Sequence, residues 1–140
     1  MISNESLANL VYVFHLLVVI FVLFAPFTGI PAILILHITF CISMIVHWGA
    51  NSNICSLSVL ESQLRGLDRT KTFTHQLIAP IYDISETEWS MIVHTITYLI
   101  LGYSMYTLYH SDKFQAFLRE LESISSFADF VHKATPLFQM

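Results

Sequence analysis

Two long runs without a charged side chain dominate the first part of the chain. Residues 7–25 and 32–50 contain no Asp, Glu, Lys or Arg. A helix rises about 1.5 Å per residue and the hydrocarbon core of a bilayer is about 30 Å thick, so each run is long enough to cross it. The segment PFTGIP, residues 26–31, holds two prolines and a glycine, which end one helix and begin the next. The sequence therefore predicts a membrane-spanning helical hairpin.

A third uncharged stretch occupies residues 89–109. It contains several Ser, Thr, Tyr and His residues, which indicates that one face of this helix meets protein rather than lipid. Only 11% of the 140 residues are charged, against about 25% in soluble proteins. We therefore predict an all-α integral membrane protein. Its membrane domain covers residues 1–110 with three spans and a structured loop over 51–88, and an amphipathic tail covers 111–140.

The flanks of the spans bear on topology. The segment before the first span has no Lys or Arg and contains Glu5, which is atypical of a cleavable signal peptide and favours an uncleaved anchor. With three spans, the loop and the tail lie on opposite sides of the membrane. Close to the span ends, Lys113 and Arg119 of the tail slightly outweigh Arg65 of the loop, which favours a cytoplasmic tail.

The loop that follows the second span predicts a short helix. Ser56 or Ser58 can cap its start, and Gly66 can end it. Glu61 and Arg65 lie four residues apart on one face. They could orient a substrate head group or move protons, but we favour a structural ion pair.

Other residues around the loop also have structural interpretations. Asn51 and Asn53 lie where the last carbonyls of the second span need partners, so we expect them to cap it. Cys41 is expected to be a small buried residue and Cys55 a free or packed thiol, because one lies inside a span and the other beyond it. A later apolar piece, residues 73–81, could dip into the interface.

The loop carries the motifs C-S-L-x-x-L-E-x-x-L-R and H-W-x-x-N-x-N-x-C-x-L-x-x-x-E. The first resembles a bacterial family of small membrane proteins of unknown function whose segment reads C-P-L-T-x-L-E-x-x-L-R, with Ser56 and Ser58 here in place of Pro and Thr. The second resembles uncharacterised membrane proteins of large DNA viruses. The resemblance covers roughly residues 7–105 and implies a shared fold without an established activity. The matching residues are His15, Leu16, Leu36, His37, His47, Trp48, Asn51, Asn53, Cys55, Leu57, Leu60, Glu61, Leu64 and Arg65.

Four histidines fall within the predicted spans: His15, His37, His47 and His94. An ionisable group there is a functional hypothesis by default. His47 and His94 each lie a few residues from the loop side, so they could face each other at equal depth. Two facing imidazoles would suit a haem iron or another transition metal. The alternative, which we favour, is that neutral histidines hydrogen-bond neighbouring helices or the loop.

The tail predicts an amphipathic helix. Its apolar residues recur at spacings of three and four, which places them along one face. Between residues 112 and 133 there are three basic and four acidic side chains, so attraction to anionic lipid is absent and contact with protein is favoured over contact with the bilayer. The helix could equally cover the protein's own spans. The residues predicted to contact a partner are Phe114, Phe117, Leu121, Ile124 and Phe127.

The whole chain carries a net charge of −4 without a basic patch, which argues against nucleic-acid binding. No catalytic set of residues, phosphate loop or metal motif can be assembled. We therefore predict a non-enzymatic integral membrane protein that anchors or organises a larger assembly, with the bilayer and other protein subunits as partners through residues 111–140. The viral resemblance implies a virion membrane or minor capsid component. The alternatives are a haem or small-ligand carrier built on His47 and His94, or a lipid-active enzyme that uses Glu61 or His75.

Overall fold

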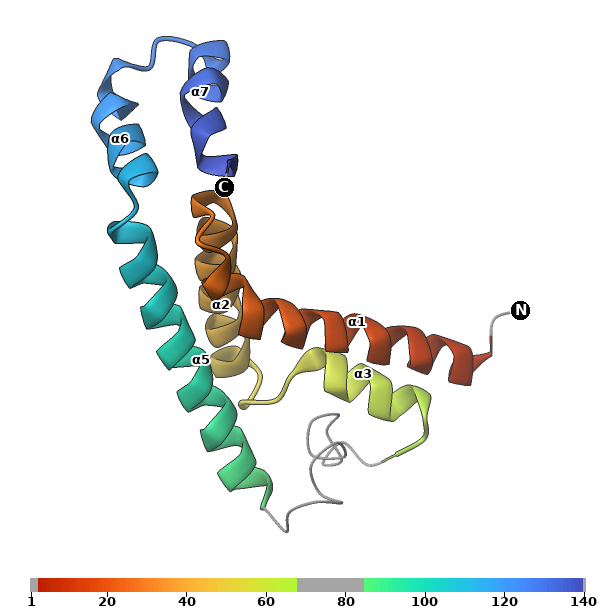
Figure 1. Cartoon of the computed structure of the whole chain (residues 1–140). Coiled ribbons are helices and arrows are strands. Elements are labelled where there is room, and N and C mark those ends of the chain that lie inside the picture. Colours follow the sequence, from red (N-terminus) through yellow and green to blue (C-terminus); the bar gives the residue numbers. More distant parts are fainter. Residues whose placement is uncertain (1–2, 68–84, 140) are drawn as a thin grey trace.

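The computed structural model describes residues 3–67 and 85–139. Throughout these two ranges the regular structure is helical, and three helices are long and apolar enough to cross a membrane. This confirms the predicted all-α fold with three candidate spans. The helices are α1 (Asn4–Phe24), α2 (Pro31–Ala50), α3 (Ser56–Leu64), α5 (Glu86–Tyr109), α6 (Asp112–Glu120) and α7 (Phe127–Ala134), with short 3₁₀ helices η1 (Ala25–Thr28), η2 (Leu121–Ser123) and η3 (Thr135–Phe138) (Figure 1). The predicted interfacial piece, residues 73–81, and His75 lie outside the described residues.

Two of the long helices begin at side-chain caps. Ser3 precedes α1, and its hydroxyl accepts a hydrogen bond from the Ser6 N–H at 3.1 Å. Before α5, the Ser85 hydroxyl accepts from the Glu88 N–H at 3.3 Å, and the Glu88 carboxylate accepts from the Ser85 N–H at 3.0 Å. This reciprocal pair satisfies two backbone donors. It starts α5 at Glu86, earlier than the predicted boundary at residue 89.

The turn between α1 and α2 is shaped by its prolines and glycine. Pro26 lies in the first turn of η1, and Gly29 follows with a φ of 67°, a left-handed conformation that suits glycine. Ile30 is extended because Pro31, the first residue of α2, disfavours a helical conformation in the residue before it. The predicted break between the first two apolar helices is therefore confirmed.

α1 and α2 leave this turn in different directions, and each packs on another helix (Figure 1). α3 lies along α1, and α5 lies antiparallel along α2. Near the turn, the Phe21 ring meets the Phe40 ring edge-on with centroids 5.7 Å apart. The predicted hairpin connection is present, but its two helices do not pack along their lengths. α1 packs on the loop helix α3 instead, where Asn9 accepts a hydrogen bond from Arg65 and His15 lies beside Cys55.

α5 presents one face to α2. Thr97 is 3% exposed, Ser104 is fully buried, and Leu108 is buried on the same face. Leu34 and Cys41 are fully buried on α2, whose principal packing partner is α5. The prediction that one face of the third span meets protein is confirmed, and hydroxyl-bearing side chains make up much of that face.

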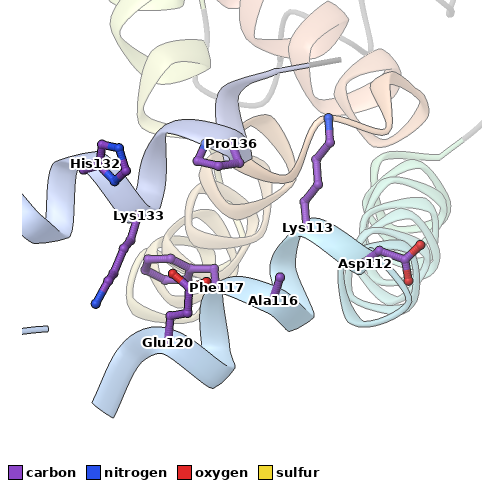
Figure 2. A pocket seen from close by; sticks show the side chains of 8 residues that line it. All are labelled: Asp112, Lys113, Ala116, Phe117, Glu120, His132, Lys133 and Pro136. Carbon is purple, nitrogen blue, oxygen red and sulfur yellow. The ribbon is translucent and has the colours of Figure 1, made fainter. Parts of the chain in front are cut away.

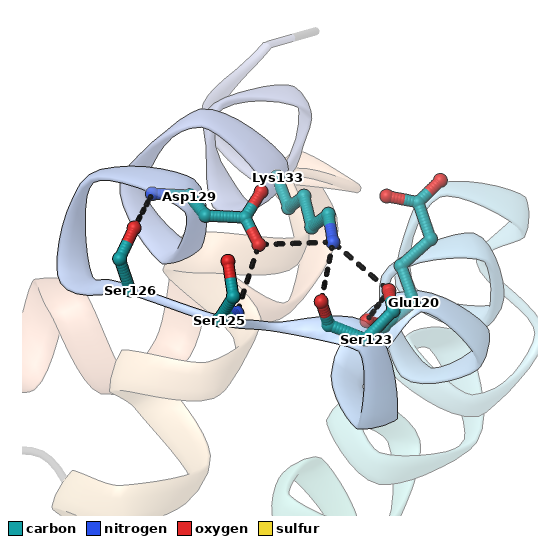
Figure 3. A network of polar contacts seen from close by, with 6 residues as sticks. All are labelled: Glu120, Ser123, Ser125, Ser126, Asp129 and Lys133. Atoms are coloured by element: carbon teal, nitrogen blue, oxygen red, sulfur yellow. Dashed lines mark hydrogen bonds and ion pairs between the residues drawn. The ribbon is translucent and has the colours of Figure 1, made fainter.

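The tail consists of two short helices rather than the single predicted helix. α7 begins after Ser126, whose hydroxyl accepts from the Asp129 N–H at 3.2 Å. The Asp129 carboxylate accepts from the Ser125 N–H at 3.1 Å and from the Lys133 ammonium at 3.1 Å (Figure 3). Serine competes for backbone hydrogen bonds and favours helix caps over helix interiors. The serine-rich segment after Glu120 therefore turns the chain instead of continuing the helix.

The second half of the tail returns to the start of α2. Leu137 of η3 is 4% exposed, and η3 contacts α2. The Phe130 ring of α7 meets the Phe117 ring of α6 edge-on, with centroids 6.0 Å apart. The Lys113 ammonium also donates to the Gln139 carbonyl at 2.9 Å. The tail thus forms a helical hairpin that packs against the α2–α5 pair at the end where α2 begins (Figure 1).

Candidate functional site

His37 lies at the junction of α1, α2 and α5. The side chain is fully buried. Its Nε2 is 3.0 Å from the Val22 carbonyl oxygen of α1, and its Nδ1 is 2.9 Å from the Ser104 hydroxyl of α5. A carbonyl can only accept, so Nε2 carries the proton and Nδ1 accepts the Ser104 hydroxyl proton. Both ring nitrogens of a neutral imidazole are satisfied in this way. His37 of α2 therefore links α1 and α5 through two side-chain hydrogen bonds.

His15 occupies a second buried position, between α1 and α3. It is 6% exposed, and its Nε2 lies 3.9 Å from the Cys55 sulfur. Cys41 lies instead beside His37, with its sulfur 3.3 Å from that ring's Nε2. The two cysteines therefore sit in separate contacts, as expected for thiols that do not pair, and both are free.

Glu61 and Arg65 form the predicted ion pair and tie α3 to α1. The Arg65 Nε donates to Glu61 Oε1 at 2.9 Å, and its Nη2 donates to the Asn9 side-chain oxygen at 3.0 Å. Glu61 is only 3% exposed. Its second oxygen, Oε2, accepts no hydrogen bond from the described residues. The geometry fits a structural clamp, because a buried carboxylate is held by one partly exposed guanidinium.

The residues after α2 form a tight turn. Asn51 caps α2, and its side-chain amide donates to the Ile54 carbonyl at 2.8 Å. Asn53 adopts a left-handed conformation with a φ of 62°, which asparagine tolerates better than most residues. The Asn53 N–H donates to the Trp48 carbonyl at 2.8 Å. Both asparagines therefore shape the loop, in agreement with their structural interpretation.

The start of α3 differs from the prediction, whereas its end agrees. Cys55 stands at the N-cap position and makes no side-chain capping bond, so neither Ser56 nor Ser58 caps this helix. The Ser56 hydroxyl lies 3.0 Å from His47 Nε2 instead, and the Ser56 N–H donates to the same nitrogen at 3.3 Å. The turn after α2 brings Ser56, the first residue of α3, beside His47. Gly66 ends the helix with a φ of 67°, as predicted.

His47 and His94 have separate partners. The His94 Nδ1 donates to the Ser90 carbonyl at 2.7 Å, and its ring packs on Trp48 with centroids 4.6 Å apart. His47 is exposed and engages Ser56. On α2, His94 thus contacts the indole of Trp48 and not the imidazole of His47. Among the described residues, no group of three or more His, Cys, Asp or Glu side chains is placed to hold a metal. The haem hypothesis has no support from these contacts and stays a prediction.

An open cleft of about 430 Å³ lies between α6 and α7 in the tail hairpin (Figure 2). Its lysines are already engaged, since Lys113 bonds the Gln139 carbonyl and Lys133 bonds Asp129. The cleft is lined by Asp112, Lys113, Ala116, Phe117, Glu120, His132, Lys133 and Pro136.

The predicted partner residues of the tail divide into two groups. Phe114 and Phe117 are half-buried within the hairpin. Leu121 is 46% exposed and Phe127 is 81% exposed, and Ile124 lies half-buried between them in sequence. Leu121, Ile124 and Phe127, which we term the tail tip, lie at the far end of the hairpin where α6 passes into α7 (Figure 1).

The bend behind the tail tip was not predicted from the sequence. Lys133 bonds both the Ser123 carbonyl at 3.3 Å and the Ser123 hydroxyl at 2.9 Å, in addition to Asp129 (Figure 3). One ammonium thus joins α7 to η2. The spacing Ser126-x-x-Asp129 in the sequence is typical of a helix start and could have indicated the bend. The apolar periodicity of the tail, which continues across it, favoured a single helix instead.

The chain matches no family model, no curated protein and no solved structure. The resemblance of its loop to bacterial and viral membrane proteins therefore stays a prediction.

Proposed function

We propose that this protein is a non-enzymatic membrane anchor that presents the tail tip to another protein subunit. The observation that carries this proposal is the exposed apolar pair Leu121 and Phe127 at the end of a braced hairpin, remote from the spans. Apolar side chains at such a position are typical of a protein contact. Lys133 and its partners fix the shape of the bend, so little ordering is needed when the tip binds.

The spans supply the anchor. Leu10 is 65% exposed, Leu17 is 58% exposed and Leu99 is 69% exposed, and all three lie on helices long and apolar enough to cross a membrane. Apolar surface of this extent is stable in lipid and unfavourable in water. The bilayer is therefore the first partner of the protein.

The position of the tail tip favours protein over the bilayer as its partner. α6 has nine residues, which makes it about 13 Å long at 1.5 Å per residue. The head-group region adds about 5–8 Å beyond each side of the hydrocarbon core. With α5 across the bilayer, α6 continues away from the end of α5 (Figure 1) and would carry the tip beyond the head groups. The near-balanced charge of the tail also gives no attraction to anionic lipid.

The loop motif supports a more specific form of this proposal. Its resemblance to membrane proteins of large DNA viruses favours an assembly in a virion membrane, where the tip would contact a capsid or another membrane protein as a minor component. The basic residues near α6 favour a cytoplasmic tail. Isolation from virions or from host membranes distinguishes these locations.

Co-purification in mild detergent tests the proposed function. The protein is isolated from its native source, and the masses and stoichiometry of accompanying proteins are measured. We expect Leu121→Ser/Phe127→Ser to lose the partner at least about tenfold, equivalent to about 1.4 kcal/mol, because both apolar contacts are removed. Phe138→Ser is the matched control, because Phe138 is 71% exposed but lies in η3 at the base of the hairpin.

Two results would contradict the proposal: a partner retained in full by the tip variant, or a chain that purifies without any stoichiometric partner. An absorption spectrum of the same sample tests the carrier hypothesis separately. A Soret band that disappears in His47→Leu or His94→Leu would favour haem binding over anchoring.

A further inference from the structure

α5 has a second face that no described helix covers. The face turned to α2 carries Thr97, Ser104 and Leu108. From Met91 onwards, the exposed residues of α5 form two strips. One carries Ile92, Ile96 and Leu99 and continues through Tyr103 and Tyr106, whose rings contact Phe27 and His110. The second strip, which we term the outer facet, recurs at spacings of four and three residues. It consists of Met91, Thr95, Tyr98, Gly102, Met105 and Tyr109, all exposed.

Tyr98 makes the outer facet unusual for a lipid-facing surface. The candidate span runs from Thr87 to Tyr109, so Tyr98 lies about 16 Å from either end at 1.5 Å per residue. That is the middle of the hydrocarbon core, yet the side chain is 54% exposed. Its hydroxyl makes no hydrogen bond to the described residues. Aromatic side chains with a polar end favour the membrane interface, where the hydroxyl is hydrated, and an unsatisfied hydroxyl in hydrocarbon is unfavourable.

Gly102 lies one turn from Tyr98 on the same facet. A Cβ atom added to this glycine would meet no atom within 4 Å. The packing within one copy of the chain therefore does not require a glycine here. Glycine inside a helix is less favourable than alanine by about 1 kcal/mol. In membranes, a glycine on a helix surface allows a second helix to approach closely.

We propose that the outer facet pairs with the outer facet of a second copy of this chain, with the two α5 helices parallel and crossing near Gly102. Two copies inserted in the same direction and related by a two-fold axis along the membrane normal place each residue opposite its own counterpart. A tyrosine hydroxyl both donates and accepts, so two Tyr98 side chains can satisfy each other. The facet carries no charged side chain, and hence no like-charge repulsion opposes the pairing.

This inference goes beyond the proposed function and uses different residues. It requires that α5 crosses the membrane, but it does not depend on the tail tip. Failure of the dimer and failure of partner binding are therefore separate results, measured on separate variants.

Cysteine cross-linking in reconstituted vesicles tests the pairing directly. Thr95→Cys is compared with Ile96→Cys in a background with Cys41→Ala and Cys55→Ser. Thr95 is exposed on the outer facet, whereas Ile96, 41% exposed at nearly the same depth, lies on the other strip. We expect oxidation to give a disulfide-linked dimer for position 95 and at least about tenfold less at position 96. Equal cross-linking at both positions, or none at position 95, would overturn the proposal.

A second variant keeps the native cysteines. Gly102→Leu is expected to raise the dimer dissociation constant at least tenfold, measured by fluorescence energy transfer between labelled copies in vesicles, while the helix content is unchanged. Gly49→Leu is the matched control, since Gly49 also lies in a helix with open space around it. A monomeric wild type, or equal dimer affinities for the wild type and Gly102→Leu, would exclude the outer facet as the dimer interface.

Discussion

Replacing Arg65 with leucine tests the clamp between α3 and α1. The Glu61 side chain is 5% exposed and that of Arg65 is 29% exposed. Among the described residues, Arg65 is the charged partner of Glu61, with its Nε donating to Glu61 Oε1 at 2.9 Å. The other carboxylate oxygen, Oε2, accepts no hydrogen bond from them. Arg65→Leu therefore leaves a buried carboxylate without compensation. It also removes the contact with Asn9, which joins the two helices.

The size of this effect follows from the exposure of the pair. Removing one partner of a fully buried ion pair costs about 3–5 kcal/mol, whereas an exposed pair contributes about 0.2–1 kcal/mol. Because the Arg65 side chain is 29% exposed, we expect α3 to detach more easily by about 2 kcal/mol in Arg65→Leu, between these limits. Glu61→Gln/Arg65→Leu removes the buried charge as well, and we expect a smaller effect of about 1 kcal/mol.

The Cys55 thiol reports this detachment, because it lies between the two helices, 3.9 Å from His15. Its rate of alkylation by a water-soluble maleimide should rise by up to about 30-fold in Arg65→Leu if reclosing is fast, since 2 kcal/mol changes an equilibrium by that factor and Cys55 is already partly exposed in the closed state. Cys41 is fully buried between other helices and gives an internal reference. A rate within about threefold of the wild type in Arg65→Leu, or faster labelling in the double variant than in the single one, would refute this reasoning.

Three further outcomes are expected. His37→Leu should lower the free energy of unfolding in detergent by about 1–2 kcal/mol, because it removes two buried hydrogen bonds between helices; an unchanged denaturation midpoint would contradict this. Gly29→Ala should cost about 1–2 kcal/mol in the same titration, because a Cβ disfavours its φ of 67°, whereas Gly49→Ala should not destabilise. The hydrogen bond from the Ser125 N–H, the largest cause, lowers the pKa of Asp129. The carboxylate therefore stabilises the tail bend above the usual aspartate pKa of about 4, and this contribution is lost as the pH falls through the lowered folded value. The NMR shifts of the α7 amides should follow that loss, and Asp129→Asn should abolish it.

The spans could be predicted from the sequence because each depends on a local property. A run of about 20 residues without charge has few stable places other than a bilayer, and the break at Pro26 and Gly29 is equally local. The arrangement of the helices is not local. Asn9 and His15 are visible in the sequence as polar positions of the first span, but they meet Arg65 and Cys55 of the loop rather than the next span. The helix against which a face of α1 packs is determined by segments that come much later in the sequence.

The histidines show why depth alone does not define a site. His47 and His94 were expected to meet because both lie a few residues from the loop side. One residue along a helix also rotates a side chain by about 100°, and this rotation turns Trp48 towards His94 and His47 towards Ser56. Likewise, the apolar spacing of the tail predicted its amphipathic character, whereas the serines decided where the helix ends.

A parallel pair of α5 helices places two tail tips on the same face of the membrane. A partner with two binding sites would then be held by both tips, which raises its apparent affinity by about 10²–10⁴ without any new contact. Gly102→Leu should therefore reduce the amount of co-purified partner even though Gly102 is remote from the tip, and Gly49→Leu should not. Leu121→Ser/Phe127→Ser should reduce partner binding while leaving the dimer intact. If Gly102→Leu separates the copies but the partner is retained in full, the two tips act independently, and the pairing serves the membrane domain alone.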